Sequence, residues 1–305
     1  MKSLVTDLKS LEIETLKNLK NSKAENTLRA YKSDYKDFAK FCSRNRFSPL
    51  PTEPKIVALY LTHLSSKSKY STLKRRLASI SVIHKLKGHY IDTKHPLIIE
   101  NLLGIKRLKG SNQKSKKPIS INDLKLIVKT ISESNLKYLR KLRDKALILI
   151  GFSGGFRRSE LVAIEHEDIE FVSEGVKIYV KRSKTDQSGE GMIKAIPYFD
   201  NEEFCPVKNL KNWISQGNIV SGKVFDISDK SVALLIKKYA GLGGLDQKKY
   251  SGHSLRSGFA TTTAESGAEE RNIMSMTGHK TTQMVRRYIK EANLFKNNAL
   301  NKIKI

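Results

Sequence analysis

The sequence predicts a mainly helical protein with a small antiparallel β-sheet, divided into two domains. Three observations lead to this fold class. The chain has 305 residues, which is enough for two domains of ordinary size. Apolar residues recur with the period of an α-helix through most of the chain. Over residues 168–197 that period changes to two, which is typical of β-strands.

The first domain, residues 1–109, is predicted to be helical throughout. After a charged leader, helical periodicity indicates helices at about 24–46, 54–64, 72–86 and 97–109. Pro54 suits a first helical turn, and Gly88 and Gly110 suit the ends of the third and fourth helices. The segment 110–118, GSNQKSKKP, is polar, basic and without periodicity, so we expect a linker there.

The second domain, residues 119–305, is predicted to be mixed α and β. Ser120 and Asp123 resemble a capping box that opens a helix. Further helices are expected at about 136–152, from 156 or 157 onward, at 206–216, at 228–239 and after Ser251. Strands are expected at 169–172, 176–180 and 192–196, with DQSGEG as the turn between the last two. The tail carries Leu294, Phe295, Leu300 and Ile303, which indicate a C-terminal tail helix.

Charge is the most informative global property. Fifty-seven Lys and Arg against 30 Asp and Glu give a net charge of +27 and a pI near 9.9. Such a balance indicates nucleic acid as the partner, because phosphates attract basic surfaces. The segment from Lys67 to Lys117 contains fourteen basic residues and only two acidic ones. The candidate DNA-binding residues are Lys74, Arg75, Arg76, Lys85, Lys87, Lys106, Arg107, Lys114, Lys116 and Lys117.

Several other classes of protein are disfavoured. No apolar run approaches the roughly 18 residues of a membrane span, and the N-terminus is too charged for a secretory signal. Cys42 and Cys205 lie far apart and are expected to be reduced, which indicates a reducing interior compartment. The expected localisation is therefore cytoplasmic, and a DNA partner would make the protein nucleoid-associated. The stretch AGLGGLDQ lacks a nucleotide-binding signature and is expected to be a plain loop.

The stretch Tyr250–Tyr288 holds the residues best suited to phosphate chemistry. Ser251 can cap a helix whose N-terminus favours an anion, and His253 and Arg256 lie three residues apart on that helix. His279 follows Gly278, and Tyr288 comes nine residues later as a possible nucleophile.

Upstream segments offer further candidates. Arg157 in GGFRRSEL follows a tight glycine turn and shares a helical face with Glu160. Lys184 stands near the tip of the predicted hairpin, where a lysine that can swing into a phosphate site is a plausible acid. Taken alone, Arg157 could equally be an ion-pair partner of Glu160, and Lys184 could be ordinary surface.

Taken together, these motifs resemble the tyrosine recombinase (phage integrase) family, and within it the Cre-like site-specific recombinases. GGFRRSEL matches the first arginine box through Arg157, Lys184 the hairpin lysine, and His253 and Arg256 the H-x-x-R motif. His279 matches the later histidine and Tyr288 the nucleophile. Arg158 is an alternative to Arg157 for the first arginine position, although the family's G-x-R-x-x-E pattern fits Arg157. Lys181 is the close alternative to Lys184 for the hairpin lysine.

The resemblance implies a helical core-binding domain and a catalytic domain that form a C-shaped clamp on double-stranded DNA. It implies integration or recombination at a specific site, as in mobile elements, through a 3′-phosphotyrosine and a Holliday junction in a homotetramer. The tail would pack on a neighbouring protomer, although packing on its own domain stays open. Glu160 would support Arg157. The resemblance implies that neither metal nor nucleotide cofactor is needed.

Two other functions remain open on the sequence. One is a type IB topoisomerase-like or end-resolving enzyme with the same nucleophile. The other is a catalytically silent DNA-binding protein, which the intact set of motif residues disfavours.

Overall fold

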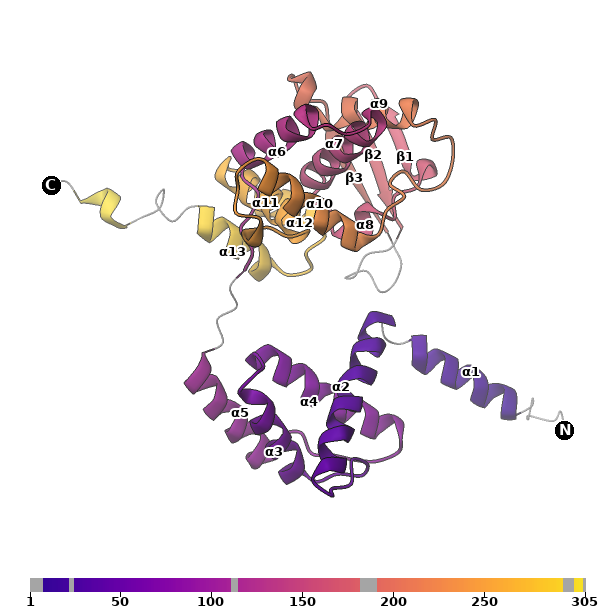
Figure 1. Cartoon of the computed structure of the whole chain (residues 1–305), viewed down its shortest axis with the longest axis vertical. Coiled ribbons are helices and arrows are strands. Elements are labelled where there is room, and N and C mark those ends of the chain that lie inside the picture. Colours follow the sequence, from indigo (N-terminus) through magenta and orange to yellow (C-terminus); the bar gives the residue numbers. More distant parts are fainter. Residues whose placement is uncertain (1–7, 22–24, 111–114, 182–190, 293–298, 304–305) are drawn as a thin grey trace. The chain divides into compact units, whose positions relative to one another are not determined.

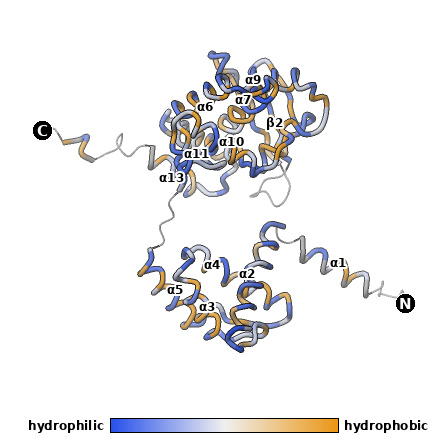
Figure 2. The backbone as a smooth tube through the Cα atoms, in the orientation of Figure 1, coloured by the Kyte–Doolittle hydropathy of each residue, from blue (hydrophilic) through white to orange (hydrophobic). Residues whose placement is uncertain are grey.

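The computed structural model describes residues 8–21, 25–110, 115–181, 191–292 and 299–303. The chain divides into two compact units, 1–114 and 115–305 (Figure 1). In both, hydrophobic and hydrophilic residues alternate along the helices, as expected where each helix has one buried face (Figure 2).

The first unit is entirely helical over its described residues. Its elements are α1 (Leu8–Asn21), α2 (Glu25–Arg44), α3 (Pro54–Ser65), α4 (Tyr70–Leu86) and α5 (Pro96–Lys109). The core forms where the apolar faces of α2 to α5 meet, around Phe38, Tyr60, Leu73, Ile80 and Ile98. Pro54 lies in the first turn of α3, where its missing N–H leaves no helical hydrogen bond unmade.

A polar cluster joins α2 to α4 beside this core. The Asp34 carboxylate is buried on α2 and accepts hydrogen bonds from Arg75 and from the Ser79 hydroxyl, the latter at 2.9 Å. Arg76 pairs with Asp37 and donates to the Tyr60 hydroxyl at 2.6 Å. The basic run on α4 is therefore partly compensated by carboxylates on α2, forty residues upstream.

The second unit places a three-stranded sheet among helices. Its elements are α6 (Ile121–Glu133), α7 (Tyr138–Ser153), α8 (Arg158–Leu161), η1 (His166–Asp168), β1 (Ile169–Val172), β2 (Gly175–Val180), β3 (Met192–Pro197), η2 (Glu202–Phe204), α9 (Pro206–Gln216), α10 (Asp229–Leu242), η3 (Gln247–Lys249), α11 (His253–Glu265), α12 (Glu270–Thr277), α13 (Thr282–Ala292) and η4 (Ala299–Lys302). The strands are antiparallel in the order β1-β2-β3, with Ile178 paired to Lys194.

The apolar helix α7 lies at the centre of this unit, as its sequence predicts. Residues Ala146 to Ile150 are wholly buried, and α6, α9 and α11 pack against the helix. The capping box at Ser120 and Asp123 is present. Asp123 also accepts a hydrogen bond from the Tyr250 hydroxyl at 3.0 Å, which holds the segment before α11 against the start of α6.

The fold class read from the sequence is confirmed: the described chain is mainly helical with one small antiparallel sheet. In the tail, the described residues form the short 3-10 turn η4, while Leu294 and Phe295 lie outside the described residues. None of the described helices combines the length and the apolar character needed to cross a membrane.

The Asp34 cluster gives a test of what holds the first unit together. We expect Asp34→Ala to destabilise α2 and α4 by about 2 kcal/mol, because a buried acceptor of two side-chain donors is removed. Glu25→Gln is the matched control, since its pair with Arg29 is exposed and worth about 0.5 kcal/mol or less. Hydrogen exchange of α2 and α4 amides measures both, and equal effects would contradict the assignment.

Candidate active site

Three segments far apart in the sequence meet in the second unit: the turn after α7, helix α11, and the junction of α12 with α13. The turn depends on Gly155, whose φ of +54° is strained for other residues. A Cβ there would lie 2.9 Å from the Phe259 ring of α11 and 3.3 Å from Thr277 of α12. Glycine thus allows the closest approach of these segments.

Arg256 is a deeply buried charge at this junction. Only 1% of the residue is exposed, and its Nη1 donates to the Gly155 carbonyl at 2.8 Å. Burial and the nearby Arg157 charge lower the pKa of its guanidinium to about 10, so the group remains charged at neutral pH. Its Nη2 is buried without a hydrogen-bond partner in the described structure. A buried cation with an unused donor is suited to receiving an anion.

Arg157 lies at the start of α8 and is held by Glu160. The Glu160 carboxylate accepts from the Arg157 backbone N–H at 2.9 Å and from Nη1 at 2.6 Å. Burial alone would raise the pKa of Glu160, but these bonds from Arg157 outweigh it and keep the carboxylate ionised. Nη2 of Arg157 also reaches the Gly278 carbonyl at 3.4 Å. Glu160 therefore orients the guanidinium.

His253 and Tyr288 lie at the exposed side of the junction. Tyr288 Oη on α13 is 3.3 Å from His253 Nε2 at the start of α11. Partial desolvation of the imidazole and the charges of Arg256, Arg157 and Arg158 lower the pKa of His253, so it is neutral at pH 7 and can accept a proton. The geometry is that of a phenol beside a general base.

His279 is buried beneath them, with its ring centroid 6.2 Å from that of Tyr288. Its Nδ1 lies 2.8 Å from Thr277 Oγ1, and the Thr277 hydroxyl donates to the Ile273 carbonyl at 2.6 Å. A hydroxyl has one hydrogen, so Thr277 must accept from Nδ1–H. The neutral ring therefore carries its proton on Nδ1 and presents a bare Nε2.

Of the two candidate lysines near the hairpin, the structure describes only Lys181. Lys184 lies outside the described residues. Lys181, its rival, directly follows β2 and pairs with Glu165 at 2.5 Å and Asp168 at 2.9 Å. Arg158, the rival of Arg157, is 41% exposed and lies 3.8 Å from Asp229, so Arg157 is the arginine that reaches the junction.

Sequence reasoning missed Lys194, which is wholly buried in β3. Its Nζ donates to the Gly154 carbonyl at 2.7 Å and to the Met276 carbonyl, and lies 4.7 Å from the centroid of the Phe156 ring. The alternation of β3 directs position 194 inward, and a lysine at an inward position is the signal that could have revealed it.

The candidate DNA-binding residues fall into three groups. Lys74, Lys85, Lys87, Lys106 and Arg107 have exposed side chains in the first unit. Arg75 and Arg76 are engaged by Asp34 and Asp37 of α2. Lys116 donates to the Lys248 carbonyl and Lys117 pairs with Asp123, both within the second unit, whereas Lys114 lies outside the described residues.

Metal ligands are not grouped in the described part of the chain: no three His, Cys, Asp or Glu side chains there could hold an ion together. The polar groups at the junction are guanidinium and neutral imidazole side chains instead.

Comparison with known proteins decides the family. The profile of the phage integrase family matches residues 117–294. The integrase/recombinase xerD homolog of Selenomonas ruminantium is 41% identical over 308 residues, which cover 96% of this chain and 89% of the relative. The chain belongs to the phage integrase family. It is a tyrosine recombinase, an enzyme of site-specific DNA recombination, and the resemblance indicated by the motifs is confirmed.

Solved structures share the fold of this tyrosine recombinase. A λ integrase tetramer bound to a Holliday junction matches with a TM-score of 0.58 and 18% identity, covering 99% of this chain and 81% of that one. The XerH recombinase in a post-cleavage complex with a palindromic difH substrate matches with a TM-score of 0.60 and 17% identity, covering 81% and 73%.

The state of His279 can be checked directly in this recombinase. Burial, with the charges of Arg256 and Arg157, lowers the pKa of His279 to about 4, so we expect a neutral ring down to about pH 4 in an NMR titration. The unfolded value is near 6.5. The unfolded chain therefore takes up this proton first, and the group reduces stability as pH falls from about 6.5 to 4.

The tautomer gives a second readout. Thr277→Val should shift the neutral ring towards the Nε2–H form, whereas the control Thr277→Ser keeps the hydroxyl and the Nδ1–H form. Nitrogen-15 shifts of His279 distinguish these forms, and an unchanged tautomer in Thr277→Val would refute the assignment.

Proposed function

We propose that the protein cleaves and rejoins DNA strands at a specific site through a 3′-phosphotyrosine on Tyr288. The observation that carries this proposal is the contact of 3.3 Å between Tyr288 Oη and His253 Nε2, beside the buried Arg256. A phenol, a base and a phosphate-binding cation are thereby brought together within one unit.

Two arginines would bind the phosphate that is attacked. Phosphodiester cleavage passes through a pentavalent phosphorane with added negative charge, and pre-oriented cations stabilise that charge. Arg157 is fixed by Glu160, and Arg256 is fixed by Gly155 and keeps a buried Nη2 available. Guanidinium groups contact two phosphate oxygens at once, which suits them to this role.

His253 would take the proton from Tyr288. A free phenol has a pKa of about 10, so attack at neutral pH requires a base. The oxygen of Tyr288 then forms a bond to phosphorus while the bond to the DNA 5′ oxygen breaks. The phosphodiester energy is conserved in the protein–DNA bond, and no ATP is consumed.

The leaving 5′ oxygen must receive a proton. Lys184 is our candidate for this acid, on the basis of its position in the hairpin sequence. His279 could donate to a phosphate oxygen through Nε2 only as an imidazolium, since Thr277 occupies its Nδ1–H. Negative charge developing on the phosphorane favours that protonated form.

Exchange between two duplexes would require four protomers and a Holliday junction. The 5′ hydroxyl of the partner duplex attacks the phosphotyrosine and releases Tyr288. The λ integrase of similar fold was solved as a tetramer bound to a Holliday junction, which supports this arrangement. Such a reaction would take place on the DNA of the nucleoid.

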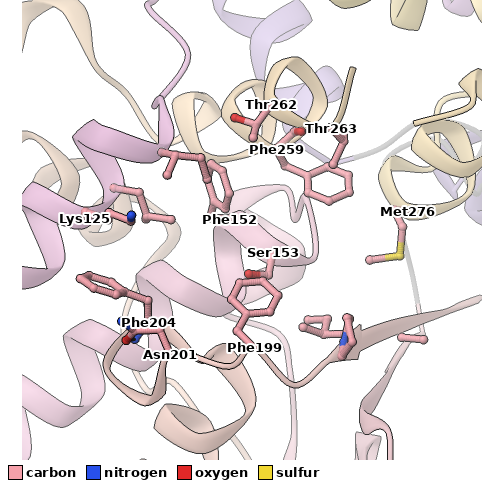
Figure 3. Close-up of a pocket in the computed structure, with 15 residues that line it drawn as sticks. Lys125, Phe152, Ser153, Phe199, Asn201, Phe204, Phe259, Thr262, Thr263 and Met276 are labelled. Carbon is pink, nitrogen blue, oxygen red and sulfur yellow. Dashed lines mark hydrogen bonds between the residues drawn. The ribbon is translucent and has the colours of Figure 1, made fainter. Parts of the chain in front are cut away.

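An apolar cavity in the second unit is our candidate site for a neighbour's tail. It has a volume of about 550 Å³, and Phe152, Phe199, Phe259 and Met276 surround it (Figure 3). The tail carries Leu294, Phe295, Leu300 and Ile303, of which the last two are 67% and 57% exposed. Burial of such side chains in a partner's cavity would link protomers in a closed ring.

The helical first unit would supply the second half of a clamp on the DNA. Its exposed lysines and arginines on α4 and α5 suit contacts to phosphates. Specific recognition would come from base contacts and from the shape of the DNA.

The nucleophile is tested by Tyr288→Phe. We expect this variant to form no covalent adduct with a nicked suicide substrate, because it lacks the attacking oxygen, and to bind DNA within about threefold of wild type. Tyr198→Phe, at a 38% exposed tyrosine, is the control and should form the adduct normally. An adduct from Tyr288→Phe would overturn the assignment of the nucleophile.

The same substrates separate strand exchange from topoisomerase-like relaxation. Substrates with two target sites should give recombined products. Relaxation of a circle that carries a single site, without products joined between sites, would favour the alternative activity.

Binding of phosphates by the first unit is tested by salt dependence. Lys85→Ala with Lys87→Ala should reduce the slope of log K against log salt by about 1 for each DNA phosphate that these ammonium groups neutralise. Lys208→Ala is the control, because its ammonium is held by Glu202 in the second unit. An unchanged slope would remove these lysines from the interface.

A further inference from the structure

Lys194 occupies a position where the fold calls for an apolar side chain. Along β3, residues 194 and 196 are buried and residues 193, 195 and 197 are exposed. A lysine is rarely fully buried unless its ammonium is partnered, because the loss of its hydration is unfavourable. The residue must therefore provide something that a leucine or methionine at this position would not.

What Lys194 provides is a pair of hydrogen bonds to two separate backbone segments. Its Nζ donates to the Gly154 carbonyl, in the turn after α7, and to the Met276 carbonyl, in the last turn of α12. The Phe156 ring lies 4.7 Å from Nζ and covers the ammonium on another side. One side chain thus joins three elements that are distant in sequence.

Both carbonyls lie three residues before a group at the active site. Gly154 precedes Arg157, and the carbonyl of the adjacent Gly155 accepts from Arg256. Met276 precedes His279, and the intervening Gly278 carbonyl accepts from Arg157. The ammonium therefore joins the segment that carries the arginines to the segment that carries the histidine.

We infer that Lys194 is a positioning residue that fixes the spacing between the two arginines and His279 by joining the Gly154–Gly155 turn to the end of α12. Its role in strand cleavage rests on the proposed function, whereas its effect on the geometry does not. A shift of about 1 Å in such a site can reduce a rate about a hundredfold.

The charge of Lys194 has a second effect at the same place. Burial, with the charges of Arg256 and Arg157, lowers the pKa of Lys194 to about 7, while Glu160 acts in the opposite direction. The Lys194 side chain is a positively charged ammonium below this pKa and becomes a neutral amine as pH rises through it. A bound phosphate group would raise this pKa by favouring the charged form. Backbone carbonyls and the Phe156 ring complete its surroundings.

The decisive variant is Lys194→Met, which keeps the length of the side chain and removes the ammonium. We expect the single-turnover rate of adduct formation on a suicide substrate to fall about 10- to 100-fold. DNA affinity should stay within about threefold of wild type. The melting temperature should change little, because relief of the buried ammonium's desolvation opposes the loss of its two hydrogen bonds to the Gly154 and Met276 carbonyls.

Lys177→Met is the matched control. Lys177 is an exposed lysine on the neighbouring strand β2 and is paired with Glu170, so its removal changes the net charge equally. It should react at the wild-type rate. The ratio of wild-type to Lys194→Met rates should also decrease as pH rises from about 7 to about 9.5, since wild type then loses the same charge.

Two results would overturn the inference. One is an adduct rate of Lys194→Met within about threefold of wild type. The other is a rate that falls only together with the melting temperature, which would make Lys194 a packing residue.

The geometry has its own readout, independent of the reaction. Loss of the bond to Met276 should shift the imidazole NMR signals of His279 in the free protein, and unchanged signals would overturn the inference. Absence of any adduct in wild type and in Lys177→Met would instead contradict the proposed function.

Discussion

The burial of the Arg256 guanidinium is the constraint around which the second unit is built. A cation without water needs compensating groups, since its desolvation costs several kcal/mol. The Gly155 carbonyl satisfies one nitrogen, while a second is buried without a partner in the described structure. Glu160 is already engaged by Arg157. The unpaired donor of Arg256 is suited to an anion, and under the proposed function that anion is a DNA phosphate.

Backbone geometry makes that burial possible. Gly155 and Gly278 both have positive φ, and each presents its carbonyl to an arginine. We infer that Lys194 fixes the separation of the Gly154–Gly155 turn and the end of α12 by donating hydrogen bonds to a carbonyl in each. Burial, together with repulsion from the nearby charges of Arg256 and Arg157, lowers the pKa values of His253 and His279. Repulsion of this kind is relieved when negative charge enters the site.

Much of the fold and of the candidate site could be predicted from the sequence, because sequence motifs and hydrophobic periodicity are local signals. The strands, the apolar helix α7 and the capping box at Ser120 follow from patterns a few residues long. The structure also brings Arg157, His253, Arg256, His279 and Tyr288 into one region. Lys194 was missed because its partners are backbone carbonyls of residues distant in sequence, which no local pattern reveals. Thr277 was missed because its contact with the His279 ring nitrogen is apparent only in the folded structure. The Asp34 pairs were missed because carboxylates on α2 lie forty residues from the arginines on α4.

The most direct test of the role of the two arginines is a crystal structure of the protein with vanadate and a DNA duplex cut at its target site. Vanadate adopts the trigonal bipyramidal geometry of the phosphorane. We expect vanadate joined to Tyr288 Oη, with Arg256 Nη2 and the Arg157 guanidinium on its equatorial oxygens. Vanadate bound elsewhere, or bound at Tyr288 with Arg256 still directed only at Gly155, would contradict this role.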